Sequence, residues 1–283
     1  MKNLAKVSTL VAGLLVAGAA SAANMYINVP GYDYTAGSHV ADANTTTGLF
    51  NEFGFSQLLA TSVYDLTDGS VMGSFYDTNY NLGALGLPTS GTPMSGTGTV
   101  SLSLPTAAQI DLDALSPLVP PLSGDSEGFL FTWGLNILYK FNGTLTASGP
   151  VYTGGTFEVW FDDYNNNAND RKVISGILTG SQLQAANLNL FLTITYAEAN
   201  FLFVEDSNGN YRDASTGDVP LVLDTNVNPP IPTPDQLLQV GTNAIRQTTL
   251  DGSITAAIPE PGSAALIGLG LLGVGALRRR RAS

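Results

Sequence analysis

The sequence predicts an all-β protein whose body is an antiparallel, β-sandwich-like domain. Three observations predict it: segments in which apolar and polar residues alternate, turn-forming residues between those segments, and a scarcity of helical patterns. Alternation with a period of two places every second side chain on one face of a strand. One face can then be buried while the other meets water, as in a domain of packed antiparallel sheets.

The clearest alternation covers residues 188–196, whose apolar side chains at every second position, ending with Tyr196, are expected on one face. A second run covers 135–141 and ends at Asn142-Gly143, a pair that favours a hairpin turn. A third covers 157–161, where aromatic and aliphatic residues alternate with Glu158 and Trp160. Each run predicts a strand with one buried face.

Few segments favour a helix. Residues 182–187 could form a turn or two of helix, and 234–240 begins like a helix with Pro234 near its first turn. Two segments rich in Gly, Pro and Ser, 87–99 and 116–126, predict exposed loops.

The N-terminus has the three parts of a signal peptide, assigned to residues 1–22. Lys2 and Lys6 precede an apolar run over 7–20, which closes on small residues with Ala20 and Ala22 spaced as signal peptidase accepts them. The run is too short for an ordinary membrane span. The sequence therefore predicts export through the inner membrane.

Charge excludes one class of partner. All 23 acidic residues lie between Asp33 and Glu260, whereas six of the 11 basic residues lie in the two end segments. The remaining five basic residues leave the passenger between the ends with a net charge near −18. Such a chain repels nucleic acid and anionic headgroups and attracts cations.

The sequence contains few residues and motifs that could support catalysis. The chain has no cysteine, which removes disulfides, thiolate nucleophiles and sulfur metal ligands. Its single histidine, His39, would have to serve any Ser-His-Asp unit, and neither a G-x-S-x-G nor an H-E-x-x-H motif occurs. The expectation is a non-enzymatic protein with no catalytic residues and no cofactor apart from a possible calcium ion.

One segment has a partial calcium-loop pattern. Asp163, Asn165 and Asn167 hold the first, third and fifth positions of such a loop and would supply hard oxygen ligands. Ala168 and Ile174 stand where the pattern needs glycine and a bidentate glutamate. A second string, 206–210, is similarly partial. Asx-rich turns produce such strings without metal, so a turn and a weak structural calcium site both stay open.

Carboxylates and aromatic residues leave a carbohydrate-directed alternative open. Glu158, Glu198 and Glu205 lie on or beside predicted strands and could form a glycosidase pair, or simply face solvent. Several aromatic residues could make a sugar-stacking platform, although such residues also fill cores. They are Tyr64, Trp133, Tyr152, Trp160 and Tyr164.

The C-terminus has three parts in a fixed order. Pro259, Glu260 and Pro261 come first, and prolines predict an extended junction open to a protease. An apolar stretch of about 14 residues over 264–277 follows, roughly 21 Å long as a helix and short of a ~30 Å hydrocarbon core. Four arginines end the tail and predict a cytoplasmic end by the positive-inside rule. They are Arg278, Arg279, Arg280 and Arg281.

This order of parts resembles the PEP-CTERM tail of Gram-negative bacteria that make exopolysaccharide. The resemblance implies recognition by an exosortase, a membrane cysteine protease, with Pro259-Glu260-Pro261 as the sorting motif and the arginine cluster as the retention signal. It divides the chain into a signal peptide (1–22), a β-rich passenger (23–225), a proline-containing spacer or last strand (226–257) and the sorting tail with a short transmembrane helix (258–283). The membrane is then a partner only through the tail, before processing.

The whole outline also looks similar to the flocculation-associated PEP-CTERM group. This resemblance implies a cell-surface or extracellular matrix protein, associated with exopolysaccharide and acting in floc or biofilm formation. Two alternatives stay open: a secreted carbohydrate-active enzyme or carbohydrate-binding module, and a calcium-stabilised adhesin.

Overall fold

The computed structural model describes residues 21–32, 44–80, 83, 85–102, 113–115, 126–185, 187–227 and 229–258. Within these residues the protein is all-β, which confirms the predicted class. The helices in this part are three short 3-10 turns: η1 (Asn167–Asn169), η2 (Ala214–Thr216) and η3 (Pro234–Gln236). None of the helices in the described ranges is long and apolar enough to cross a membrane.

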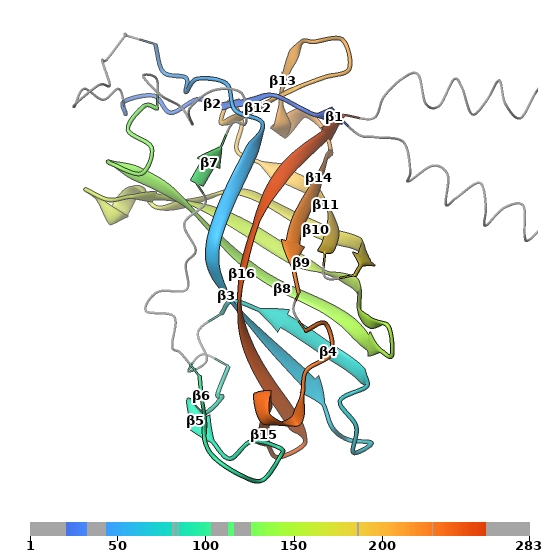
Figure 1. Ribbon diagram of the computed structural model, residues 1–283. Coiled ribbons are helices and arrows are strands. Elements are labelled where there is room, and N and C mark those ends of the chain that lie inside the picture. Colours follow the sequence, from blue (N-terminus) through green and yellow to red (C-terminus); the bar gives the residue numbers. More distant parts are fainter. Residues whose placement is uncertain are drawn as a thin grey trace, which may run out of the picture.

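Eight antiparallel strands form one large sheet that closes on itself. Its hydrogen-bonded order is β3, β4, β8, β9, β10, β11, β14, β16, and β16 pairs with β3 again. The closing pair extends from Asn243 opposite Asp65 to Thr255 opposite Glu52, and the two strands lie side by side in Figure 1. These strands are β3 (Glu52–Asp65), β4 (Gly73–Thr78), β8 (Trp133–Thr146), β9 (Gly149–Asp163), β10 (Arg171–Gln184), β11 (Asn187–Ala197), β14 (Val219–Asn226) and β16 (Asn243–Ile258).

Closure requires strong bending, and glycines at register shifts permit it. At Gly252 of β16, a Cβ atom would lie 2.0 Å from the Asp224 carbonyl oxygen, so a side chain cannot be accommodated without a backbone shift. At Gly143 of β8, a Cβ atom would lie 2.6 Å from the Val151 carbonyl oxygen. The close approach of neighbouring backbones at these bulges lets the long strands curve around a single core.

Shorter elements cover the ends of the closed sheet. The three-stranded sheet β13-β12-β2 lies at one end (Figure 1), where Met25 and Leu202 contribute to the main hydrophobic core. At the other end β15 pairs with β16, and Leu238 packs with Val63 and Ile245 in a second, smaller cluster. The shorter strands are β1 (Ser21–Ala22), β2 (Met25–Ile27), β5 (Ser90–Gly91), β6 (Val100–Ser101), β7 (Asp113–Leu115), β12 (Leu202–Glu205), β13 (Tyr211–Asp213) and β15 (Leu238–Val240).

Most predicted inward faces are the ones that the structure buries. The core contains every second residue of both runs, namely Leu135, Ile137, Tyr139, Phe141, Phe157, Val159 and Phe161. Glu158 and Trp160 point outward and are half-buried. Tyr196 is the exception, because it is 48% exposed although Ile194 is buried. Ser175 pairs with Tyr196 but Gly176 pairs with Ile194, so Thr195 is the extra residue of a bulge and reverses the facing of Tyr196.

Two local expectations differ from the structure. Asn142-Gly143 is a bulge inside β8, and the hairpin turn comes later, because pairing continues to Thr146 opposite Gly149. The helical turn expected over 182–187 is absent from the described residues there, because β10 continues to Gln184, Ala185 has φ +56°, and β11 begins at Asn187. Of the two alternatives for the stretch after Asn226, the structure contains β15 and β16, and β16 closes the sheet.

Several predicted features lie outside the described residues. These are the signal peptide apart from its last two residues, His39, and the sorting tail from Pro259 onward with its transmembrane helix and arginine cluster.

Candidate functional site

The first candidate site is the junction between the folded body and the sorting tail. Strand β16 ends at Ile258, so the predicted motif begins at the next residue. Strand β1 pairs with this end: Ser21 lies opposite Ile258 and Ala22 opposite Ala257. The predicted signal-peptidase residue Ala22 therefore lies beside the last residues of β16 (Figure 1), whereas Ala20 falls outside the described residues.

A second candidate lies on the outer face of β9, β10 and β11. Lys172 Nζ donates a hydrogen bond to Glu158 Oε1 at 3.1 Å, and Trp160 Nε1 donates to Glu158 Oε2 at 3.2 Å. Lys172 Nζ also lies 6.0 Å from the centre of the Tyr196 ring. Tyr80 lies close enough for the Glu158 carboxylate to raise its hydroxyl pKa, although burial is the larger cause. We call these five residues the outer aromatic surface.

The outer aromatic surface has the chemistry of a sugar-binding face. Half-buried Trp160 and exposed Tyr196 present aromatic carbon to solvent, and Glu158 and Lys172 keep about a third of their side-chain surfaces exposed, 34% and 38%. Aromatic rings pack against the apolar faces of sugars, and charged groups bond to hydroxyl groups.

The predicted aromatic platform divides between this surface and the core. Trp160 belongs to the outer aromatic surface, and Tyr164 is 42% exposed in the turn after β9. Tyr64, Trp133 and Tyr152 are buried among core side chains. Of the five aromatic residues, only Trp160 and Tyr164 are therefore placed to contact a sugar at the surface.

The three glutamates considered for a glycosidase pair have separate partners. Glu158 binds Lys172, Glu198 accepts from Arg171 Nε at 2.8 Å, and Glu205 accepts from Asn24 Nδ2 at 2.6 Å. They lie on β9, beyond the end of β11 and on β12, respectively. Each carboxylate thus stabilises a local contact.

The Asx-rich turn after β9 is organised by Asp163, which is only 4% exposed. Its carboxylate accepts hydrogen bonds from the Tyr32 hydroxyl at 2.8 Å, from Asn169 Nδ2 at 2.7 Å and from the Asn165 backbone amide at 3.0 Å. The Asn169 bond is the main cause that lowers the pKa of Asp163 below its ordinary value. This geometry is the one expected of an Asx turn.

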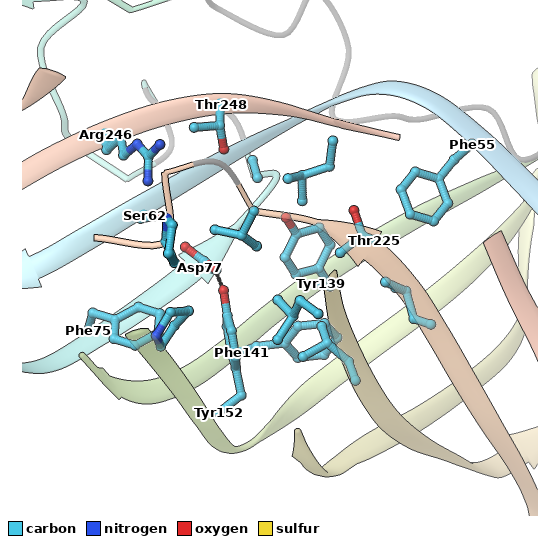
Figure 2. A pocket seen from close by; sticks show the side chains of 18 of the residues that line it. Phe55, Ser62, Phe75, Asp77, Tyr139, Phe141, Tyr152, Thr225, Arg246 and Thr248 are labelled. Carbon is cyan, nitrogen blue, oxygen red and sulfur yellow. Dashed lines mark hydrogen bonds between the residues drawn. The ribbon is translucent and has the colours of Figure 1, made fainter. Parts of the chain in front are cut away.

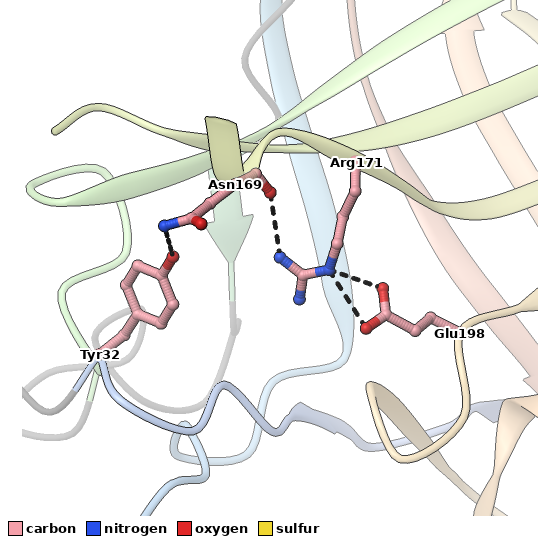
Figure 3. Close-up of polar contacts among 4 residues, drawn as sticks. All are labelled: Tyr32, Asn169, Arg171 and Glu198. Atoms are coloured by element: carbon pink, nitrogen blue, oxygen red, sulfur yellow. Dashed lines mark hydrogen bonds and ion pairs between the residues drawn. The ribbon is translucent and has the colours of Figure 1, made fainter. Parts of the chain in front are cut away.

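Neighbouring contacts tie the same turn to the end of β11. Figure 3 shows Asn169 between Tyr32 and Arg171: its carbonyl oxygen accepts from Arg171 Nη1 at 3.3 Å, and the Arg171 guanidinium also binds Glu198. The guanidinium carbon lies 4.5 Å from the centre of the Phe161 ring. In the described ranges, no group of three or more His, Cys, Asp or Glu side chains is placed to hold a metal ion.

The second string, 206–210, is also a turn. The Asp206 carboxylate accepts from the backbone amides of Asn208 at 2.7 Å and Asn210 at 3.0 Å. Both bonds lower the pKa of Asp206, and the bond from the Asn210 amide has the larger effect.

Sequence reasoning missed a third candidate, a polar row inside the closed sheet (Figure 2). Arg246 of β16 lies opposite Ser62 of β3, and Ser62 lies opposite Asp77 of β4. The Tyr152 hydroxyl donates to Asp77 Oδ2, whereas the buried Asp77 Oδ1 has no hydrogen-bond partner. Burial raises the pKa of Asp77 even though Ser62, Tyr152 and Arg246 act to lower it.

The sequence held one weak signal of this row. Phe75 and Asp77 are two residues apart in one strand and therefore share its inward face. An acidic residue on an apolar face suggests a buried polar contact, but its hydrogen-bond partner Tyr152 is 75 positions later in the sequence, and Arg246 is later still.

Comparison with protein families identifies the tail. Residues 257–281 match the model of the PEP-CTERM protein-sorting motif. Searches of curated proteins and of solved structures found no match. The chain therefore carries a PEP-CTERM protein-sorting motif, and this motif indicates an exported protein that an exosortase sorts and processes on its way to the cell surface.

Proposed function

We propose that the chain is a non-enzymatic component of the cell surface or extracellular matrix that binds exopolysaccharide and acts in floc or biofilm formation. The observation that carries the proposal is the sorting motif that follows β16 directly. Because the folded domain ends where the motif begins, cleavage at the motif would release this domain intact. The cargo delivered outside the cell is then the closed sheet itself.

The outer aromatic surface supports polysaccharide as the partner. Trp160 and Tyr196 flank an ion pair of Glu158 and Lys172, so apolar and hydrogen-bonding groups alternate on one exposed face. A neutral or mixed-charge polymer suits this surface better than a polyanion, because the passenger has a net charge near −18.

Gene deletion tests the role. Cells that lack the gene should stay planktonic while still making polysaccharide, and the wild-type gene should restore flocs. A complementing gene with Trp160→Ala and Tyr196→Ala should restore export but not flocs. Ile177→Ala, which removes an exposed apolar side chain elsewhere on β10, is the matched control and should behave as wild type. Unchanged flocculation in the deletion strain would refute the role.

The same surface favours the carbohydrate-binding module as a second candidate. Co-sedimentation of the processed protein with purified exopolysaccharide separates it from a purely structural component. Hydrolysis of that polymer by the wild type, lost in Glu158→Gln, would instead support a carbohydrate-active enzyme.

A further inference from the structure

Two segments of the chain have the sequence Asn-x-Ser/Thr in which x is not proline, a motif that marks asparagines able to accept an N-linked sugar in exported proteins. They are Asn44-Thr45-Thr46 and Asn142-Gly143-Thr144. Both follow the predicted signal peptide, so export carries both to the side of the inner membrane on which oligosaccharide is transferred to proteins. The structure gives the two asparagines different surroundings.

Asn44 lies on an exposed turn that brings the two groups of its motif together. Its side-chain Oδ1 accepts hydrogen bonds from the Thr46 backbone amide at 2.7 Å and from the Thr46 hydroxyl at 3.2 Å. The bond from the backbone amide two residues later defines an Asx turn. The carboxamide that would be modified and the hydroxyl group that the motif requires are therefore adjacent at the surface.

The turn is held beside the chain that follows β2. The Val29 backbone amide donates to the Thr45 carbonyl oxygen at 2.7 Å, and the Thr45 hydroxyl donates to Asn28 Oδ1 at 2.6 Å. An isolated bridge pairs Asn28 with Thr46, outside the strands of the closed sheet. These contacts fix the conformation of the turn while Asn44 stays exposed to an enzyme.

Asn142 is exposed as well, but its motif lies within a paired strand. It belongs to β8, opposite Tyr76 of β4 on one side and Gly154 of β9 on the other. Residues two apart in an extended strand are separated by about 6.8 Å along its axis, so a strand does not bring the Asn142 carboxamide and the Thr144 hydroxyl together as the turn does at Asn44. This part of β8 would have to leave the sheet to enter an active site.

The residues that precede the two asparagines differ in charge. Asp42 stands two positions before Asn44 in the sequence, whereas Lys140 stands two positions before Asn142. Bacterial oligosaccharyltransferases select an acidic residue at this position, and a lysine there has the opposite charge. Sequence and geometry thus favour the same asparagine.

We propose that Asn44 is an acceptor for N-linked glycosylation, with a polyprenyl-diphosphate-linked oligosaccharide as the sugar donor. In the transfer, Asn44 Nδ2 forms a bond to the anomeric carbon of the first sugar, and the bond from that carbon to the diphosphate oxygen breaks. One amide proton passes to a base of the transferase and polyprenyl diphosphate leaves, so the step requires no oxidant or reductant. The outer aromatic surface has no residue in 44–46, and the proposal does not depend on polysaccharide binding there.

Mass spectrometry of the passenger recovered from the surface of its native host tests the site. We expect the peptide that contains Asn44 to carry one glycan, which electron-transfer fragmentation should locate on Asn44 and not on a neighbouring threonine. The glycan should be lost in Asn44→Gln and in Thr46→Ala, and kept in Thr46→Ser, because serine retains the hydroxyl group. An unmodified Asn44 peptide in the wild type, or a glycan that persists in Asn44→Gln, would overturn the proposal.

The second motif separates the effect of geometry from that of sequence. Lys140→Asp gives Asn142 an acidic residue at the same spacing and leaves its motif within β8. Asn142 should stay unmodified in the wild type and in this variant, while Asn44 carries its glycan in both. Circular dichroism checks that each variant is folded. Modification of Asn142 in folded Lys140→Asp would overturn the role assigned to the exposed turn.

Discussion

At the scale of single residues, two buried carboxylates in this protein have opposite environments. Asp163 receives donors from four groups at the Asx turn, including Tyr32 and Asn169, and its pKa is lowered. Asp77 lies inside the closed sheet with one oxygen unpartnered, and burial raises its pKa. The difference arises because hydrogen bonds stabilise the charged form of a carboxylate and desolvation destabilises it.

Replacement of Asp163 should loosen the turn. Asp163→Ala leaves several donors without an acceptor, so we expect the free energy of unfolding to fall by about 1–3 kcal/mol in urea denaturation. Asn165→Ala, at an exposed position of the same turn, should change it by less than about 0.5 kcal/mol. Because the folded pKa of Asp163 is lowered, its contribution is present above the unfolded pKa and is lost as pH falls through the folded value.

The hypothesis of a calcium-stabilised adhesin can be tested at the same residue. A calcium-stabilised adhesin would gain melting temperature when calcium is added and lose it with a chelator. We expect neither change, because the Asp163 carboxylate already accepts bonds from protein donors. A rise in melting temperature with calcium that disappears in Asp163→Ala would support the calcium-stabilised adhesin instead.

Ionisation of Asp77 should cost stability as pH rises. The folded state retains this proton to higher pH, so the stabilisation is complete below the unfolded pKa of about 3.9 and declines as pH rises through the raised folded value. Asp77→Asn cannot ionise, so its melting temperature should rise relative to wild type between about pH 3 and about pH 7. The groups facing Asp77 are Arg246 and the tyrosines 64, 139 and 152, and burial raises the pKa of all three tyrosines, that of Tyr64 to about 12. A difference in melting temperature that is constant with pH would contradict the assignment.

At the scale of elements, register shifts between strands determine which side chains point outward and which point into the core. The bulge at Thr195 turns Tyr196 outward and so completes the outer aromatic surface. The shift between Leu250 and Gly252 lets β16 continue against β3 while it also pairs with β14. Such bulges concentrate twist and bending, which a closed sheet requires.

A single methyl group at a bulge should therefore be costly. Gly252→Ala would place a Cβ atom 2.0 Å from the Asp224 carbonyl oxygen. We expect the free energy of unfolding to fall by about 1–3 kcal/mol, the usual cost of overpacking. Gly154→Ala is the matched control, since its Cβ atom would meet nothing within 4 Å. Equal stability of the two variants would show that the sheet relaxes freely at residue 252.

At the scale of the whole molecule, the residues next to the two predicted cleavage regions are paired, because β1 lies against the end of β16. Strand β1 touches only the last two residues of β16, whereas residues 243–256 of β16 join β3, β14 and β15. Removal of the end segments thus leaves the closed sheet intact, while loss of β16 opens it.

Two chain lengths test this division. A chain ending at Ile258 should keep a single cooperative thermal transition in circular dichroism. A chain ending at Asn226 lacks β15 and β16, exposes two unpaired sheet edges and should lose that transition. Cooperative unfolding of the shorter chain would mean that the region after Asn226 acts as a spacer.

By itself the sequence determined the all-β class, the buried faces of 135–141 and 157–161, and the sorting tail, because alternation and short ordered motifs are local patterns. Only the tertiary structure decided that β3 and β16 meet to close the sheet, that Tyr196 faces outward, and that Asp77, Ser62 and Arg246 form one polar row. Those outcomes depend on strand register between segments far apart in the chain. A shift of one residue reverses every side chain beyond it, and no local pattern records it.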